Sequence, residues 1–191
     1  MSGETEFWTK KSFSRLNKVQ LVEATNWLCT RDKDLSLIVK QFGIPPLWQR
    51  PEGFCTLLFL ILEQQVSLAS ARATFRRLVK YLKKRVTPDQ FLKLQITELR
   101  ELGFSRQKVR YTRLLAESIK DASLPLKELG HFNDDDAKAM LMKVTGIGHW
   151  TADVYLMEAL GRPDVWPAGD LALALAVEKV KGLSIRPDFK V

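Results

Sequence analysis

Two features of the sequence, a glycine hairpin and an aspartate that follows it, could carry chemistry together. Gly146-Ile147-Gly148 lies between two segments with a helical period, and Asp170 begins a third. Glycines permit a tight turn and a close approach to a ligand, and free N–H groups at the start of the next helix can hold a phosphate. Such a turn would clamp a nucleic-acid backbone without reading its sequence. A nearby carboxylate could stabilise positive charge on a sugar.

Each feature also has an ordinary structural interpretation. A Gly-x-Gly sequence often only connects two helices, and an aspartate at the start of a helix is most often an N-cap. Residue types alone favour these two readings over chemistry. The surrounding sequence must therefore decide between them.

The chain is predicted to be all-α, because nearly every segment has a helical period and none shows the sustained alternation of a half-buried strand. Thr87-Pro88 predicts a capped helix start. Asn133 predicts another, and the helix dipole explains the three acids after it better than a metal site does. Helices are expected at about 18–30, 33–42, 54–65, 68–85, 88–94, 97–102, 106–121, 134–144, 149–160 and 170–181.

Proline and glycine interrupt the helical pattern at 43–46 and 161–167. These breaks predict three segments. Residues 1–53 would form N-terminal helices that pack with the C-terminal segment, and 54–165 a central lobe with the hairpin region at about 134–160. Residues 166–191 would carry the helix that begins at Asp170. Two helical lobes with a cleft between them are expected.

Composition limits the partners and cofactors that we expect. A net charge of +8 and a pI near 9.6 favour a polyanionic partner. Cys29 and Cys55 are too few for a four-cysteine zinc site or iron–sulfur cluster. No apolar run is long enough for a membrane span, and the first residues lack the features of a signal peptide. We therefore expect no membrane association and no zinc or iron–sulfur centre.

The segment from Leu141 to Asp170 resembles the signature of the helix-hairpin-helix DNA glycosylase superfamily. The shared features are the Gly-Ile-Gly hairpin, Thr151-Ala152 in the second helix, and Asp170 after a Gly/Pro-rich loop. Upstream, Gln64-Gln65-Val66-Ser67 resembles the 3-methyladenine DNA glycosylase II branch, and GFSRQKVR at 103–110 resembles its Gly-Leu-Ser-x-x-Lys segment. Three motifs in family order are more specific than any one of them. The resemblance runs from about 34 to 183.

The resemblance implies a base-excision enzyme that flips an alkylated purine out of duplex DNA and hydrolyses its N-glycosidic bond, leaving an abasic site. Asp170 would be the catalytic carboxylate. Bifunctional members use a lysine nucleophile where this chain has Trp150. Because no lysine occurs between Lys143 and Lys179, the sequence predicts a monofunctional glycosylase for bases of the 3-methyladenine or 7-methylguanine type.

The resemblance also implies a base pocket at Trp150. Alkylation at N3 or N7 makes a purine cationic, so an aromatic face can hold it by stacking and cation–π attraction. Val154 and Tyr155, one turn further along, are candidates for the pocket wall, as are Trp48 and Trp166 from the flanking lobe. For Trp48, Tyr155 and Trp166 we favour the alternative of packing in the core.

The family places an intercalating side chain in the loop matched by Gln65, which we expect to fill the gap left by the flipped base. Gln64 and Ser67 would shape this turn, with Ser67 equally suited to a helix cap. The residues expected at DNA are Gln64, Gln65, Ser67, Arg106, Lys108, Gly146, Ile147, Gly148, His149 and Thr151.

No cofactor is required for this chemistry. The resemblance implies a structural Na⁺ or K⁺ at the hairpin, held by the backbone carbonyls of Met142, Val144 and Ile147. Double-stranded DNA with damaged bases is the expected partner, and a monomer is expected. The expected location is the cytoplasm, at the nucleoid, in a bacterium or the nucleus in a eukaryote.

Two alternatives stay open at the level of the sequence. Family members continue past the catalytic helix with a tryptophan-bearing segment, whereas this sequence stops at Val191. A naturally short protein and a truncated form both stay open, and a short form would have an open pocket. A non-catalytic helix-hairpin-helix module would keep the hairpin but need neither Asp170 nor a pocket. A helical protein-interaction domain would need neither the hairpin nor the basic faces. Salt-sensitive DNA binding would separate the last alternative from the other two.

Overall fold

The computed structural model describes residues 15–83 and 85–188, which are helical with connecting loops and contain no strand. The prediction of an all-α chain is confirmed for this part. None of its helices is long and apolar enough to cross a membrane. The helices are α2 (Lys18–Cys29), α3 (Lys33–Phe42), α4 (Phe54–Glu63), α5 (Leu68–Leu82), α6 (Pro88–Leu92), α7 (Ile96–Glu101), α8 (Arg106–Lys120), α9 (Asp134–Met142), α10 (His149–Val154) and α11 (Leu171–Lys181), with short turns η1 (Leu129–His131) and η2 (Tyr155–Ala159).

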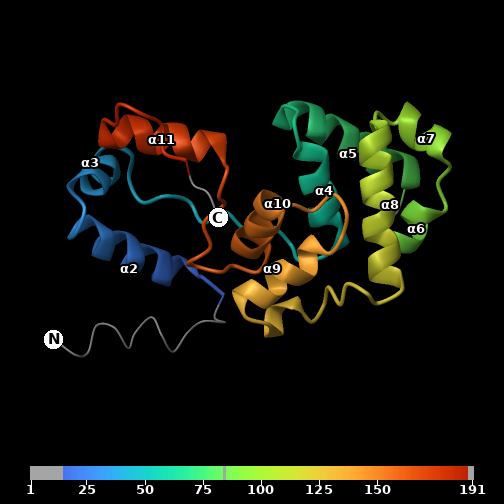
Figure 1. The fold of residues 1–191 in the computed structure, drawn as a ribbon, viewed down its shortest axis with the longest axis horizontal. Helices are drawn as coiled ribbons and strands as arrows, with labels where there is room; N and C mark the ends of the chain where they lie inside the picture. Colours follow the sequence, from blue (N-terminus) through green and yellow to red (C-terminus); the bar gives the residue numbers. More distant parts are fainter. Residues whose placement is uncertain (1–14, 84, 189–191) are drawn as a thin grey trace.

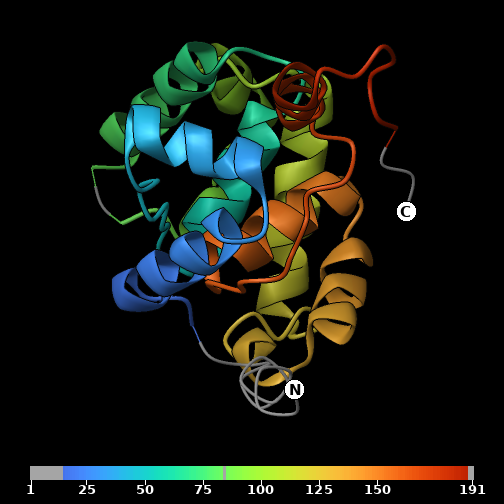
Figure 2. The ribbon, with the colours of Figure 1, turned by 90° about the vertical axis from the view of Figure 1, so that its left-hand side faces the viewer.

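The helices form two lobes (Figure 1). The terminal lobe consists of α2, α3 and α11, and the central lobe contains α4 to α10 with η1 and η2. Figure 2 shows the three helices of the terminal lobe from its own side. The Lys181 ammonium at the end of α11 lies 2.6 Å from Asp32 Oδ2 and 2.8 Å from Asp34 Oδ2, at the start of α3. Segments from the two halves of the chain thus build one lobe; the predicted extensions over 1–14 and 189–191 lie outside the described residues.

The core belongs to the central lobe and is built around α4. Leu57, Leu58, Leu60 and Ile61 of this helix are fully buried, because α4 packs against α5, α8, α10 and η2. A helix that is apolar on all sides is stable only when it is enclosed in this way. The α4 helix therefore forms the rigid base of the hairpin region.

The terminal lobe buries much less of its own surface. All ten residues of α3 keep some exposure to solvent, and Phe42 at its end is 73% exposed. Thr25 is the buried residue of α2 and Ala174 that of α11. The position of this lobe therefore depends largely on its contacts at the junction with the central lobe.

The predicted helix over 149–160 is not one regular α-helix. After α10 the chain widens into the π-helical turn η2, in which the Leu160 N–H donates to the Tyr155 carbonyl oxygen at 3.1 Å. Such turns re-aim side chains and are frequent at functional sites. Here η2 carries the chain from the hairpin helix towards the loop before α11.

A buried arginine holds the loop that follows η2. Arg162 is 2% exposed, and its Nη2 donates to the carbonyl oxygens of Gly130 and Phe132, each at 2.9 Å. Its Nε lies 3.3 Å from Asp134 Oδ1 at the start of α9. A guanidinium can satisfy several acceptors at once because it has five donors in a fixed plane. Arg162 thereby fixes the start of the loop to the base of the hairpin.

Replacing Arg162 with leucine is expected to lower the free energy of unfolding by about 3 kcal/mol, since buried carbonyl oxygens and a carboxylate would lose their partner. Urea denaturation followed by far-UV circular dichroism measures this change. Lys120→Leu is the matched control because Lys120 pairs with Asp89 at the surface, where ion pairs contribute little. Equal stability of the two variants would contradict the assigned role of Arg162.

Candidate functional site

The hairpin between α9 and α10 has the tight geometry expected of its glycines. The Ile147 N–H donates to the Val144 carbonyl oxygen at 3.0 Å, and Gly146 has a φ of +100°. A Cβ atom on Gly146 would lie 2.3 Å from Cγ of Tyr111. Both the backbone conformation and the neighbouring ring therefore require glycine here. The Ile147 side chain is buried in the core and anchors the turn, so it offers no side chain to DNA.

Gln64, at the C-terminus of α4, ties the hairpin to the core. Its Nε2 donates to the Gly146 carbonyl oxygen at 2.9 Å and to Thr151 Oγ1 at 3.0 Å. Thr151 is itself buried. Both amide protons of Gln64 position the hairpin, which agrees with its predicted role in shaping the turn. The DNA contacts of Gln64 and Thr151 stay a prediction.

The next residue, Gln65, has a different position. It is exposed, and its backbone has a φ of +57°, a left-handed conformation that is uncommon for residues other than glycine. Its side chain lines a pocket that is also lined by the hairpin residues Gly146 and Gly148. The strained turn thus projects from the end of α4 at the position where the sequence predicts an intercalating residue.

Of the other residues expected at DNA, two cap helices and two are exposed. Ser67 caps α5, because its Oγ accepts from the Ser70 N–H at 3.2 Å. Lys108 donates from Nζ to the Leu62 carbonyl oxygen at 2.5 Å, and burial lowers the pKa of its ammonium group. The Lys108 side chain thus caps the end of α4, which favours a structural role over the predicted phosphate contact. Arg106 and His149 are exposed at the starts of α8 and α10 and remain candidates.

Asp170 uses its two carboxylate oxygens for different purposes. Oδ1 accepts from the Leu173 N–H at 2.9 Å and caps α11. Oδ2 accepts from the indole Nε1–H of Trp150 at 2.8 Å. The cap and the candidate catalytic group are therefore the same side chain. The indole holds the second oxygen in place, while its remaining lone pair can still face a ligand.

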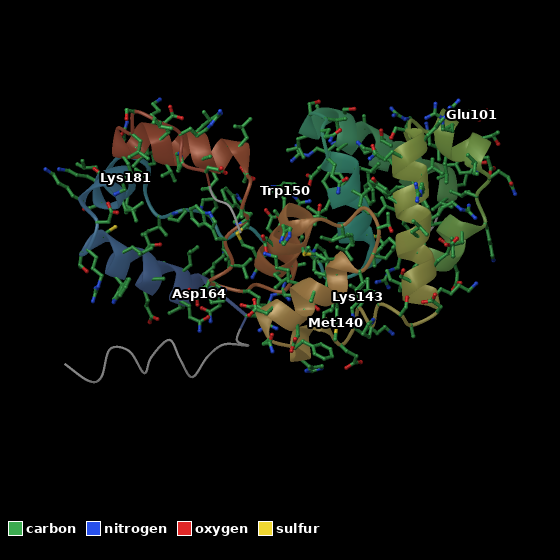
Figure 3. All side chains as sticks on the ribbon, viewed as in Figure 1. Glu101, Met140, Lys143, Trp150, Asp164 and Lys181 are labelled. Atoms are coloured by element: carbon green, nitrogen blue, oxygen red, sulfur yellow. The ribbon has the colours of Figure 1, made fainter. Side chains whose placement is uncertain are left out.

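The Trp150–Asp170 contact separates two hollows, and Figure 3 shows Trp150 in the middle of the molecule, between the lobes. The hairpin hollow, about 850 Å³, is lined by residues that include Gln65, Tyr111, Gly146, Gly148, Trp150 and Asp170. The aromatic hollow, about 630 Å³, is lined by residues that include Trp48, Trp150, Val154, Met157, Trp166 and Asp170. A group on the DNA backbone at the hairpin and a base among the aromatic rings could therefore both reach Asp170.

The sequence favours core packing for Trp48, Tyr155 and Trp166, and of these three only Tyr155 lies in the core. Trp48 is 68% exposed and Trp166 48% exposed, and both line the aromatic hollow, so the expectation that they fill the core is wrong. Tyr155 is fully buried, and its hydroxyl oxygen accepts from the Gly53 N–H at 3.0 Å. Burial raises the pKa of Tyr155 to about 12. Tyr155 belongs to the core and is not part of the pocket wall.

No sequence motif predicted the ion-pair group of Arg50, Glu63 and Glu158 that lines the aromatic hollow. Arg50 Nη1 lies 3.1 Å from Glu63 Oε2, and Arg50 Nε pairs with Glu158. The Arg50 N–H also donates to the Glu158 carbonyl oxygen at 2.9 Å. These contacts fix the loop segment that connects the two lobes and carries Trp48. The partners come from three separate segments, which no local pattern could have connected.

The arrangement suits the stabilisation of a cation. A fixed carboxylate next to a stack of aromatic rings favours positive charge on a bound ring or on the sugar attached to it. A purine nucleotide could place its base in the aromatic hollow and its sugar beside Asp170.

Comparison with known proteins agrees with this geometry. YfjP of Bacillus subtilis, named as a candidate DNA-3-methyladenine glycosylase, is 31% identical over 160 residues, which cover 80% of this chain and 56% of YfjP. The alkylbase DNA glycosidase-like protein mag2 of Schizosaccharomyces pombe is 27% identical and covers 86% of this chain and 80% of mag2. The chain thus spans little more than half the length of YfjP.

Solved structures show the same fold. The 3-methyladenine DNA glycosylase Mag1 of S. pombe, in complex with abasic DNA, superposes with a TM-score of 0.78 at 26% identity, over 87% of this chain and 84% of Mag1. A DNA-3-methyladenine glycosidase of Bacillus halodurans gives a TM-score of 0.72 at 29% identity, over 81% and 72% of the two chains. The model of one family, described as the HhH-GPD superfamily base excision DNA repair protein, matches residues 58–189. The chain belongs to the HhH-GPD superfamily of base excision DNA repair proteins.

Proposed function

We propose that this protein is a monofunctional DNA glycosylase that removes alkylated purines of the 3-methyladenine or 7-methylguanine type from duplex DNA. The observation that carries the proposal is the position of Asp170 Oδ2, held by Trp150 where the hairpin hollow meets the aromatic hollow. The names of YfjP, mag2 and Mag1 support the same reaction.

The proposed reaction breaks the bond between the base and C1′ of the sugar. The cationic purine leaves as a neutral base and takes the bonding electrons, so positive charge moves to the sugar. The Asp170 carboxylate stabilises this charge. Water then adds to C1′ and releases a proton, leaving an abasic site. Because the chain has tryptophan at position 150 in place of the lysine nucleophile of bifunctional relatives, strand cleavage is not part of the reaction.

DNA binding is proposed to involve the hairpin, Gln65 and Arg106. The N–H groups at Gly148 and His149 would meet a phosphate of the strand, since the cap residue Gly148 has no side chain to bind them. Gln65 would enter the gap left by the flipped base, and the exposed Arg106 would contact the backbone. We propose a monomer that acts on chromosomal DNA, in the nucleoid of a bacterium or the nucleus of a eukaryote.

The hairpin carbonyls of Met142, Val144 and Ile147 are proposed to hold a Na⁺ or K⁺ ion. The Val144 carbonyl oxygen accepts the Ile147 N–H, but a carbonyl oxygen has a second lone pair that can bind a cation. The ion would supply positive charge next to a DNA phosphate. It takes no part in breaking the glycosidic bond, and no other cofactor is proposed.

Asp170→Asn is expected to reduce base release from methylated duplex DNA by at least about 100-fold, because the neutral amide cannot stabilise the cationic sugar. Asparagine caps helices as well as aspartate does, so the fold and DNA binding should persist. Released bases are measured by chromatography, and abasic sites by strand breaks that appear only after heat or alkali.

Asp89→Asn is the control, since Asp89 pairs with Lys120 at the surface and lines neither hollow, and it should release bases like the parent protein. If the parent and both variants bind duplex DNA but none releases a base, the chain is a non-catalytic DNA-binding module. Base release that survives in Asp170→Asn would remove Asp170 from the catalytic role.

Trp150→Phe is expected to lower kcat about tenfold, since it keeps an aromatic ring but removes the N–H that holds Asp170 Oδ2. Trp48→Phe should chiefly raise KM, because Trp48 lines the hollow without a described contact to Asp170. Single-turnover kinetics on a duplex with one 7-methylguanine separate these effects. A rise in KM alone for Trp150→Phe would mean that the indole acts only as a stacking surface.

Arg106→Gln should reduce the dependence of log K on log salt by about one unit, as expected when one phosphate contact is lost. Lys108→Gln should leave that slope unchanged and lower stability, because Lys108 caps α4. Fluorescence anisotropy with an unmodified duplex at several salt concentrations measures the slope. A smaller slope for Lys108→Gln would restore Lys108 as a phosphate ligand.

A further inference from the structure

The aromatic hollow is negatively charged, although the chain as a whole carries a net charge of +8. Its described lining includes one cation, Arg50, and three carboxylates, Glu63, Glu158 and Asp170. One positive and three negative charges give a net charge of −2 at this wall. Negative charge repels a polyanion such as DNA. We therefore expect the three carboxylates to interact with something other than the DNA backbone.

Within the lining of the aromatic hollow, Arg50 serves two carboxylates, while Arg72 and Arg76 line the neighbouring pocket that Arg50 and Glu63 also border. A single guanidinium serves both Glu63, through Nη1 at 3.1 Å and Nη2 at 3.3 Å, and Glu158, through Nε. The three side chains are between 10% and 26% exposed. Partial burial lowers the effective dielectric constant, so two charges several ångströms apart interact more strongly here than in water. The group formed by Arg50, Glu63 and Glu158 therefore contributes a net charge of −1 to the hollow.

We propose that this group determines the specificity of the base pocket and that it selects bases by charge. The inference rests on the proposed function. Stacking on Trp48, Trp150 and Trp166 can hold any purine, but the extra carboxylate favours only a purine that carries a positive charge. N3- and N7-alkylated purines are thus preferred over neutral lesions such as hypoxanthine and ethenoadenine.

The effect belongs mainly to binding. During bond cleavage the positive charge moves from the base to the sugar, so the total charge near the group stays the same. An interaction that is equal in the ground state and the transition state changes KM and leaves kcat unaltered. Glu158 is therefore a specificity residue, and its removal should be distinguishable from that of Asp170 by kinetics.

Glu158→Gln tests the proposal because it removes one charge while keeping an amide oxygen for Arg50. The substrates are two duplexes, one with a single 7-methylguanine and one with a single hypoxanthine. The ratio of KM for the methylated duplex to KM for the hypoxanthine duplex is expected to rise roughly tenfold, because only the cationic base loses a charge interaction. Glu117→Gln, on the exposed surface of α8, is the isosteric control and should match the parent. Equal changes for both substrates, or no change for either, would overturn the proposal.

A binding measurement keeps the test independent of activity. Quenching of tryptophan fluorescence gives the affinities for 7-methylguanosine and guanosine at mildly acidic pH, where the methylated nucleoside is a cation. The parent is expected to bind the methylated nucleoside about tenfold more tightly, and Glu158→Gln should lose this preference. Equal affinities in the parent would refute charge selection. A parent that shows the preference but releases no base would instead refute the proposed glycosylase activity.

Thermal unfolding of each variant is measured first. If Glu158→Gln does not fold, Glu63→Gln makes the same change of charge on the other side of Arg50 and is expected to give the same loss of discrimination. A folded Glu63→Gln that keeps the full preference would refute the proposal.

Discussion

The hydrogen bond from the Trp150 indole to Asp170 Oδ2 is the contact on which the site depends. Trp150 comes from α10 of the central lobe, and Asp170 is the first residue before α11 of the terminal lobe. One bond thus joins the lobes and orients the carboxylate. Because both hollows border this bond, moving either lobe would pull Asp170 away from Trp150 and the hairpin.

Buried and half-buried polar side chains hold the parts around that bond. Gln64 fixes the hairpin, Lys108 caps α4 below it, and Arg162 fixes the loop that leads to Asp170. Each of these side chains satisfies main-chain carbonyl oxygens that would otherwise lack a partner in or near the core. The groups proposed to bind DNA are the exposed ones, chiefly Gln65, Arg106 and the main chain of the hairpin. Stability and binding are divided between neighbouring residues of the same motifs.

The two lobes contribute differently to the site. The central lobe has a dense core around α4 and holds the hairpin rigidly, whereas the terminal lobe buries few residues and supplies α11. The crossing segment with Trp48 and Arg50 links them through the ion pairs to Glu63 and Glu158. This division places the aromatic hollow at the junction, where its size depends on how the lobes meet.

The helices, the hairpin and the place of Asp170 at a helix start could be predicted from the sequence, because helical period, caps and turn residues are local properties. The motif resemblance distinguished Gln65 from Gln64, but it did not distinguish Arg106 from Lys108, since both are basic and lie in the same motif. Three outcomes came from the fold: Lys108 caps α4, Trp48 and Trp166 line a hollow, and Arg50 pairs with two glutamates. These outcomes depend on contacts between segments far apart in the chain, and no local pattern records which partner a side chain will meet.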